Sequence, residues 1–367
     1  MGKGKREKKK TKDKKTKKSG KLLIIFLILI IIGAGGALGY KILKDKEKTE
    51  PVAEEETPVA PKPEEKKVKI FSGTDRPFAV MIDNHSDAWP QVGLQKAYMI
   101  YEIIVEGGET RLMALFKGVD VDQIGPVRSA RHYFLDYALE NDAIYAHFGQ
   151  SPQAESDIKK LSVNDINGIA EDGTTFWRVK GKAAPHNAIT STEKLLESAK
   201  NKKYTTTSPK ESVLNYIPDE VELTEGEGAI SVTIPHSDKQ TVKYTYDEAN
   251  KVYKRSARNK AQTDWTTGET ITTKNIIITF CDNYTLSDSE NKGRQGLKNI
   301  GTFDGYYITN GKAIKIKCIK DSREAQTVYK DLDGNVIKVN DGNTFVNICP
   351  INSKVVLEAP EEPDVES

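Results

Sequence analysis

Cysteine is scarce in this sequence, which has three cysteines among 367 residues, at positions 281, 318 and 349. Three thiols allow at most one disulfide, so the chain is not a small scaffold held together by disulfides. Cys318 and Cys349 end apolar, strand-like runs in which buried thiols are common, and we expect no disulfide, with a single one as the alternative. No cysteine stands just after the N-terminal apolar segment, which excludes a lipid-modified cysteine as the anchor there.

Histidine is scarce too, and the few histidines are scattered along the chain. The five are His85, His132, His147, His186 and His236. No two of them have the spacing of a Cys/His metal cluster, so the sequence predicts no metal site and no cofactor.

The N-terminus contains a basic segment followed by an apolar one. Residues 1–21 include twelve Lys or Arg and two acidic residues, a net charge of +10. Residues 22–40 are uncharged, and nineteen residues at about 1.5 Å each span roughly 28 Å, close to the thickness of a bilayer core. The positive-inside rule then predicts a single-pass anchor with a cytoplasmic N-terminus and an extracellular remainder.

A cleaved secretory signal is the alternative interpretation of the same segment, with the small residues 33–37 as a cleavage region. The apolar run is longer than the core of a usual signal, and Lys41 and Lys44 follow it as interface residues do. These two features favour a retained anchor.

Charge and composition change after the anchor. The whole chain carries +2, so residues 22–367 carry −8, which argues against a nucleic-acid partner. Residues 41–69 are rich in Pro, Glu and Lys and are expected to form an extended linker. In polyproline geometry residues 44–69 of this linker reach roughly 80 Å, which would place the folded part within a thick cell wall. Residues 353–367 form an acidic tail.

The pattern of residues 70–205 predicts an α/β domain, with α+β as the alternative, because strands alternate with helical patterns. Ser151-Pro152 predicts a helix start, with Ser151 as the cap, and Thr190 with Glu193 predicts a capping box. The expected strands are 78–83, 97–105, 111–117 and 143–148, and the expected helix is 129–141.

Residues 215–352, after a short linker at 206–214, read as a mostly β domain, because short runs rich in Thr, Ile, Val and Tyr alternate with turns. Segments 247–250 and 333–334 predict hairpin connections. The expected strands are 221–234, 241–246, 251–255, 270–280, 305–308, 313–318 and 344–348.

The residues suited to chemistry gather in the first domain. Segment 125–132 contains Arg128 and Arg131 at the predicted start of a helix, where unpaired N–H groups attract anions. Arg111 begins the third strand and is the third candidate cation. Together they predict a site for phosphate or carboxylate.

Acidic residues lie near these arginines in the sequence, at Asp83, Glu102, Glu106 and Glu109. Three interpretations stay open: a buried ionic network without turnover, an anion-binding site, or a catalytic site. For catalysis, Asp83 and Glu106 would hold a divalent metal or act as base. His147 or His186 would then move a proton, although a histidine in a turn is more often a hydrogen-bonded fixture.

Several segments of the first domain form recognisable motifs: RPFAVMIDN (76–84), PQVGL (90–94), YE (101–102), VEGG (105–108), GPVRSAR (125–131), HFGQSP (147–152) and PHN (185–187). Together they resemble the YerB-like lipoproteins, a two-domain bacterial family of undefined function found mainly in Firmicutes. The resemblance covers about residues 70–350, and it implies an extracytoplasmic, membrane-attached protein. The chain departs from the family in its anchor, where a membrane helix replaces the lipid-modified cysteine.

A weaker pattern is similar to the LytR-type phosphotransferases: a strand ending in Asp, a strand beginning with Arg, and a loop containing Arg-Ser-Ala-Arg. That similarity implies transfer of a polymer from a polyprenyl pyrophosphate, with arginines on the pyrophosphate and acids on a divalent metal. Two hypotheses follow. The first is an anchored cell-envelope protein that binds wall polymer or an envelope protein. The second is an envelope enzyme acting on a phosphorylated or acidic glycan.

Overall fold

The computed structural model describes residues 66–287 and 289–360. The predicted basic tail, membrane anchor and acidic tail beyond residue 360 lie outside the described residues, as does most of the predicted linker. Among the residues that the structure describes, no helix is long and apolar enough to cross a membrane.

The strands expected in the first half form close to their predicted positions. Asp83, expected at the end of the first strand, is its last residue. The strands are β1 (Phe78–Asp83), β2 (Met99–Ile104), β3 (Thr110–Phe116), β4 (Ile144–His147), β5 (Asp165–Asn167), β6 (Trp177–Arg178) and β7 (Ala188–Ile189).

The helices of the first half differ in part from the prediction. The helix expected from residue 129 begins only at Phe134, because the preceding chain is extended and Val127 and Ala130 form bridges with Ile82 and Gln150. Consequently, Arg128 and Arg131 do not lie on a helix N-terminus. The helices are α2 (Phe134–Glu140), α3 (Pro152–Lys160), α4 (Thr192–Asn201) and the 3-10 turns η1 (Ser86–Ala88), η2 (Leu94–Lys96) and η3 (Glu106–Gly108).

The two predicted helix caps have different outcomes. Ser151 caps α3 as expected, since its Oγ accepts a hydrogen bond from Ala154 N at 3.2 Å. The cap of α4 is Ser191 and not Thr190, because Thr190 donates its hydroxyl to the carbonyl of Thr175 instead. Thr190 and Ser191 carry the same capping group, a hydroxyl, so the sequence alone does not show which of them caps α4; the contact of Thr190 with Thr175 decides it.

The second half is built of strands, as expected, and segment 247–250 connects β11 to β12 as a hairpin. The predicted strand 221–234 is instead two shorter strands, β9 and β10. The strands are β8 (Tyr216–Ile217), β9 (Glu227–Gly228), β10 (Ser231–Pro235), β11 (Thr241–Asp247), β12 (Val252–Ala257), β13 (Lys260–Ala261), β14 (Thr272–Thr273), β15 (Asn275–Thr285), β16 (Gln295–Lys298), β17 (Gly301–Thr309), β18 (Lys312–Lys320), β19 (Val328–Lys330), β20 (Val339–Asn340), β21 (Thr344–Pro350) and β22 (Val356–Glu358).

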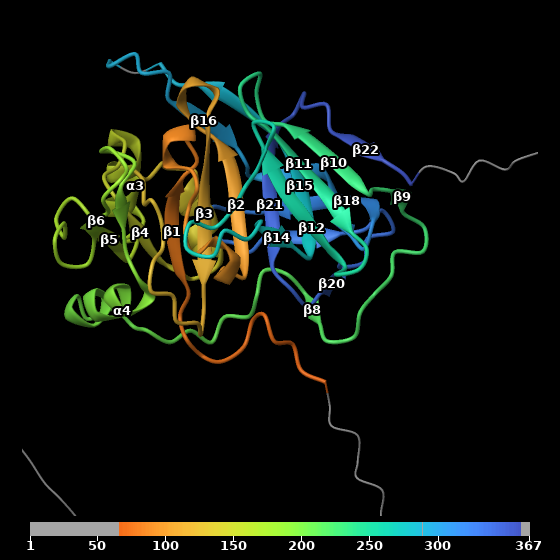
Figure 1. The fold of residues 1–367 in the computed structure, drawn as a ribbon, viewed down its shortest axis with the longest axis horizontal. Helices are drawn as coiled ribbons and strands as arrows, with labels where there is room; N and C mark the ends of the chain where they lie inside the picture. Colours follow the sequence, from red (N-terminus) through yellow and green to blue (C-terminus); the bar gives the residue numbers. More distant parts are fainter. Residues whose placement is uncertain (1–65, 288, 361–367) are drawn as a thin grey trace, which may run out of the picture. The chain divides into compact units, whose positions relative to one another are not determined.

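Strands from both halves join a single 12-stranded sheet (Figure 1). Its main path runs β19-β18-β17-β15-β21-β2-β3-β1-β4-β5, so the junction between the halves is a strand pair. The late strand β21 is parallel to both of its neighbours, β15 and β2. The α/β half and the mostly β half are therefore continuous through the sheet.

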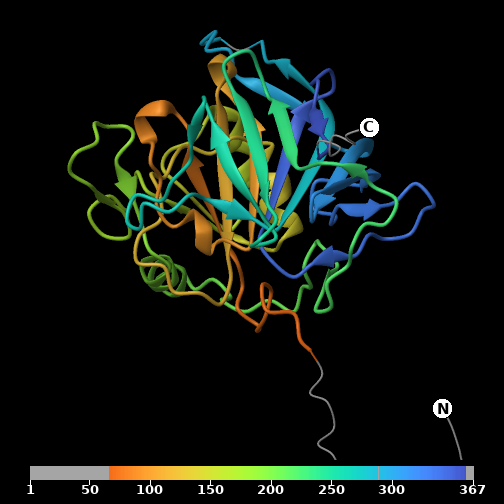
Figure 2. The same ribbon diagram turned by 45° about the vertical axis from the view of Figure 1, so that its right-hand side comes forward.

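Alternate residues of the central strands pack into two cores on opposite faces of this sheet. Val80 and Ile82 lie in the core that also contains α4 and the second sheet, β13-β12-β11-β10-β22. Ala79 and Met81 lie in the other core, against α2 and α3. The turned view in Figure 2 shows the β strands of the second half beside those of the first. By alternation, Asp83 falls on the face that carries α2 and α3.

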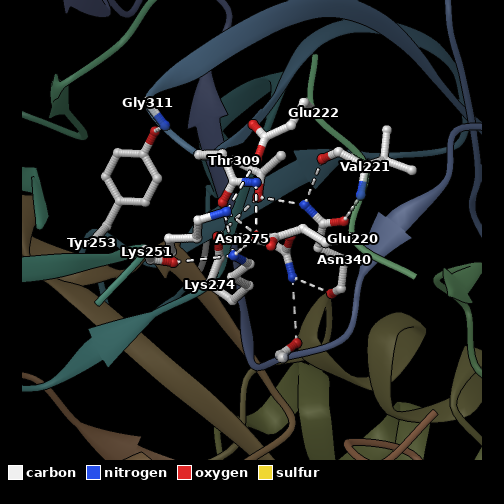
Figure 3. A network of polar contacts seen from close by, with 12 residues as sticks. Glu220, Val221, Glu222, Lys251, Tyr253, Lys274, Asn275, Thr309, Gly311 and Asn340 are labelled. Carbon is white, nitrogen blue, oxygen red and sulfur yellow. Dashed lines mark hydrogen bonds and ion pairs between the residues drawn. The ribbon is translucent and has the colours of Figure 1, made fainter. Parts of the chain in front are cut away.

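A polar network holds the segment before β9 against the second half (Figure 3). Glu220 pairs with Lys251 at 3.0 Å and also with Lys274. Beside it, Asn340 accepts from Val221 N at 2.7 Å and donates to Val221 O at 3.0 Å. The segment before β9 is thus tied to the rest of the second half.

Candidate functional site

Asp83 and Arg111 lie directly opposite each other on the antiparallel strands β1 and β3. Directly opposed residues point to the same face of a sheet, so a buried carboxylate and a buried guanidinium share one end of the strand pair. Arg111 Nη1 donates to the carbonyl of Ser129 at 2.6 Å. Burial, together with the charge of Arg131, lowers the pKa of Arg111 to about 10.

The Asp83 carboxylate joins three segments of the chain. Its Oδ1 accepts the backbone N–H of His85 at 3.1 Å. Its Oδ2 lies 2.7 Å from His186 Nδ1, which donates to it, and 3.1 Å from Arg128 Nε. One carboxylate therefore holds a turn, a histidine and an arginine together.

Arg128 differs from the other two arginines of this cluster because the N–H donors of its guanidinium are not used in hydrogen bonds with the described residues. The ion pair with Asp83 lacks hydrogen-bond geometry, and the Nε group is buried without a hydrogen-bond acceptor. No hydrogen bond from the Arg128 side chain is formed within the described part of the chain. Because 27% of this side chain is exposed, its two Nη atoms, unlike the buried Nε, can still bind an anion from solvent.

Arg131 is fully engaged, in contrast. Its Nε and Nη2 donate to the two carboxylate oxygens of Glu106 at 2.6 and 2.9 Å. Burial opposes ionisation of Glu106, but this two-point contact outweighs it and lowers the pKa of the carboxyl group. This part of the cluster is the ionic network that the sequence allowed.

The two candidate histidines occupy different environments. His147 is buried, with Nδ1 2.8 Å from the carbonyl of Gly149 and Nε2 3.1 Å from Asp165 Oδ2. Both of its ring nitrogens therefore face oxygen atoms of the protein. Within residues 66–287 and 289–360, the His186 ring forms a hydrogen bond through Nδ1 alone, to Asp83, which leaves Nε2 available for chemistry.

Two other acidic residues pair with arginines of the second half. Glu102 on β2 forms an ion pair with Arg255 on β12, and neither side chain is exposed. Glu109 pairs with Arg258. The sequence pattern did not indicate either partner, because each pair joins residues about 150 positions apart.

The structure brings together two histidines that are far apart in the sequence. The rings of His85 and His186 are stacked, with centroids 4.9 Å apart and an interplanar angle of 19°. Asp87 is beside them, with its Oδ2 3.7 Å from His85 Nδ1. His186 lies in segment 185–187, which carries the resemblance to the YerB-like lipoproteins, and His85 directly follows segment 76–84, so the resemblance was the available signal.

A cavity of about 460 Å³ adjoins this turn. Ser86, between the histidine and the aspartate, lines it together with Trp89 and Arg258, and Lys260 also contributes. The turn at Ser86 thus faces a cavity on the side of Arg258 and β13. The three arginines exceed Asp83 and Glu106 by one formal positive charge, so this arrangement is suited to an anion.

Comparisons with known proteins agree with this fold. Residues 64–205 match the N-terminal domain, and residues 231–346 the C-terminal domain, of a family described as "Protein of unknown function (DUF3048)". A putative lipoprotein, YerB of Bacillus subtilis, is 29% identical over 286 residues, covering 75% of this chain and 81% of that protein. The crystal structure of YerB from Bacillus subtilis matches with a TM-score of 0.69 and 28% identity, over 77% of this chain and 94% of that one.

Proposed function

This chain belongs to the DUF3048 family, and on that premise we propose that it is a membrane-anchored protein of the bacterial cell envelope that binds an anionic wall polymer at Arg128. The single observation that carries the proposal is the Arg128 guanidinium, which is held by Asp83 yet forms no hydrogen bond within the described residues. An arginine in this state offers a planar fork to phosphate or carboxylate at little cost in side-chain entropy.

The location in the envelope is supported by two independent observations. The similar Bacillus subtilis protein is described as a putative lipoprotein. In this chain, the apolar residues 22–40 follow a strongly basic segment, an order that predicts a single-pass anchor with the N-terminus inside. The predicted topology is tested with protease on intact cells, which should remove the folded part and spare a tag on the lysine tail. Digestion of the tail in intact cells would overturn it.

The binding proposal is tested by cosedimentation of the full chain, purified in a non-ionic detergent, with isolated cell walls. Arg128→Ala should lower wall binding at least tenfold, because one charge-assisted fork is lost. The matched control is Lys317→Ala, which removes an exposed cation on β18, far along the sheet from β1. Binding that depends equally on both residues would indicate nonspecific charge attraction and contradict the proposal.

Protein stability is measured on the same variants. We expect Arg128→Ala to retain the unfolding midpoint of the original protein, because the side chain is partly exposed and forms no hydrogen bond. Cooperative loss of structure in this variant would assign Arg128 to the ionic network and remove the binding proposal. Wall polymer stripped of phosphate and carboxylate groups should also fail to bind; retained binding would point to a protein partner.

An envelope enzyme acting on a phosphorylated or acidic glycan is the second candidate, and the Asp83–His186 contact favours it. A carboxylate that accepts Nδ1–H leaves Nε2 of the imidazole as a base, oriented by the same carboxylate. Mass spectrometry of wall fragments after incubation with the full chain tests this candidate. Altered fragments that disappear with His186→Ala would establish the enzyme, and unaltered fragments would exclude this activity.

A further inference from the structure

We propose that His85, Asp87 and His186 form a binding site for one divalent transition-metal ion of the Zn²⁺ class. Each residue offers one ligand atom, and these atoms lie within 4.8 Å of one another. Two ligands come from the turn after β1, and the third comes from the turn before β7. The site thus depends on the tertiary fold and is invisible in the sequence, where 100 residues separate His85 from His186.

The surroundings of His186 are those of a metal-binding histidine. Its Nδ1 donates to Asp83 Oδ2 at 2.7 Å, which fixes the ring and leaves the Nε2 lone pair directed away from Asp83. Histidine ligands in metal sites usually make this contact with a carboxylate, which orients the ring and raises its basicity. Asp83 Oδ1 also accepts His85 N–H at 3.1 Å, so the same carboxylate positions the backbone of the second ligand.

Access and remaining space also suit an ion. The side chains of His85 and Asp87 are 40% and 68% exposed, so an ion can enter from solvent and Asp87 can rotate to close the set. Three protein ligands leave coordination positions for water or a bound molecule, as in metal sites that act on substrates. The adjoining cavity of about 460 Å³ provides room for such a molecule beside Ser86 and Trp89.

The ligand chemistry selects the class of metal. Two imidazoles and one carboxylate favour Zn²⁺ and similar ions, whereas Ca²⁺ and Mg²⁺ prefer sites made of oxygen atoms. Arg128, paired with Asp83, places a positive charge nearby and weakens the affinity for the free ion. The proposal does not rest on the proposed wall binding, because metal binding is measured without any polymer.

The experiment uses the full chain in detergent, freed of metal with a chelator that is then removed by dialysis, and titrated with Zn²⁺ in a calorimeter. We expect one equivalent of Zn²⁺ to bind. His85→Ala and His186→Ala should each weaken binding at least tenfold, whereas His132→Ala, a histidine outside the cluster, should leave it unchanged. Asp83→Asn should weaken it roughly tenfold through the orientation of His186.

Cobalt substitution provides a second measurement, since Co²⁺ bound by imidazole absorbs visible light according to its coordination. We expect His85→Ala to abolish the cobalt spectrum. Because the His85 side chain is partly exposed, this variant should keep its unfolding midpoint, and a retained midpoint excludes unfolding as the cause of the loss. Absence of Zn²⁺ binding, or binding that His85→Ala and His132→Ala affect equally, would overturn the site. Loss of wall binding in Arg128→Ala with Zn²⁺ binding intact would separate the two proposals.

Discussion

At the scale of single residues, one carboxylate determines what the candidate site can do. Asp83 contacts His85, Arg128 and His186, so its two carboxylate oxygens position all three of these residues, to each of which we assign a role. The sequence grouped Asp83 with Arg128 in one candidate site, but it did not predict their ion pair. It could not predict the contact of Asp83 with His186, because no periodicity links residues 103 positions apart.

The buried pair Glu102–Arg255 permits a first stability prediction at this scale. Glu102 also accepts from Thr110 Oγ1 at 2.7 Å and from Asn84 Nδ2 at 3.2 Å. Glu102→Gln removes the charge that compensates a fully buried arginine, so we expect a loss of about 3–5 kcal/mol in the free energy of unfolding. Denaturant unfolding measures it, with the exposed pair Glu155–Lys159 as the control.

In that control, Glu155→Gln should cost less than about 0.5 kcal/mol, because an exposed helical ion pair contributes little. Equal losses in the two variants would show that the Glu102–Arg255 pair is hydrated in solution and contradict the buried contact.

At the scale of elements, strands were predicted better than helix ends. The strand 78–83 was predicted at its observed bounds because six consecutive buried residues produce a clear apolar run. The helix expected at 129–141 forms, but its expected start at residue 129 was wrong. The apolar spacing of Tyr133 and Phe134 does not reveal that the preceding residues bridge to other segments. Side-chain patterns report burial, whereas the first turn of a helix depends on where the backbone hydrogen bonds go.

The network around Glu220 permits a prediction of how the stability of the protein changes at acidic pH (Figure 3). Hydrogen bonding to Lys274 is the largest cause that lowers the pKa of Glu220 from 4.5 to about 2. A lowered carboxyl pKa stabilises the fold above pH 4.5, and that contribution is lost as the pH falls from 4.5 toward 2. The stability difference between the original protein and Glu220→Gln should shrink across this window.

We expect this difference to be below about 1 kcal/mol at pH 6, because the Glu220 side chain is partly exposed and solvent screens its ion pairs. It should decrease further in 1 M salt. Denaturant unfolding at pH 6 and pH 3 measures it. A difference that grows on acidification would contradict the ion pairs with Lys251 and Lys274.

At the scale of the whole molecule, the two halves share the 12-stranded sheet through β21. The α/β and mostly β character of the halves was read from the alternation of apolar runs and turns. The pairing of strands from the two halves could not be predicted in this way, because the sequence of a strand indicates which of its residues are buried but not which strands lie beside it. Strand β21 lies between β2 of the first half and β15 of the second.

This arrangement predicts that the halves unfold together. Thermal unfolding of the full chain should show one transition for probes placed in both halves, because separating them exposes the edges of β2 and β21. Phe345→Ala on β21, which removes a buried ring packed against Tyr244, should lower the stability seen by both probes by about 3–5 kcal/mol. Two separate transitions, or a loss confined to the second half, would contradict the shared sheet.

The position of β21 near the end of the chain also determines when the molecule can finish folding during biosynthesis. During synthesis and export, residue 99 emerges long before residue 344. Strand β2 therefore stays unpaired on the side of β21 while most of the chain is still being made. Throughout that interval the β2 edge is open to wrong partners. A nascent chain that stops before Thr344 lacks every residue that pairs with β2, so the first half can complete its sheet only when nearly the whole chain has been made.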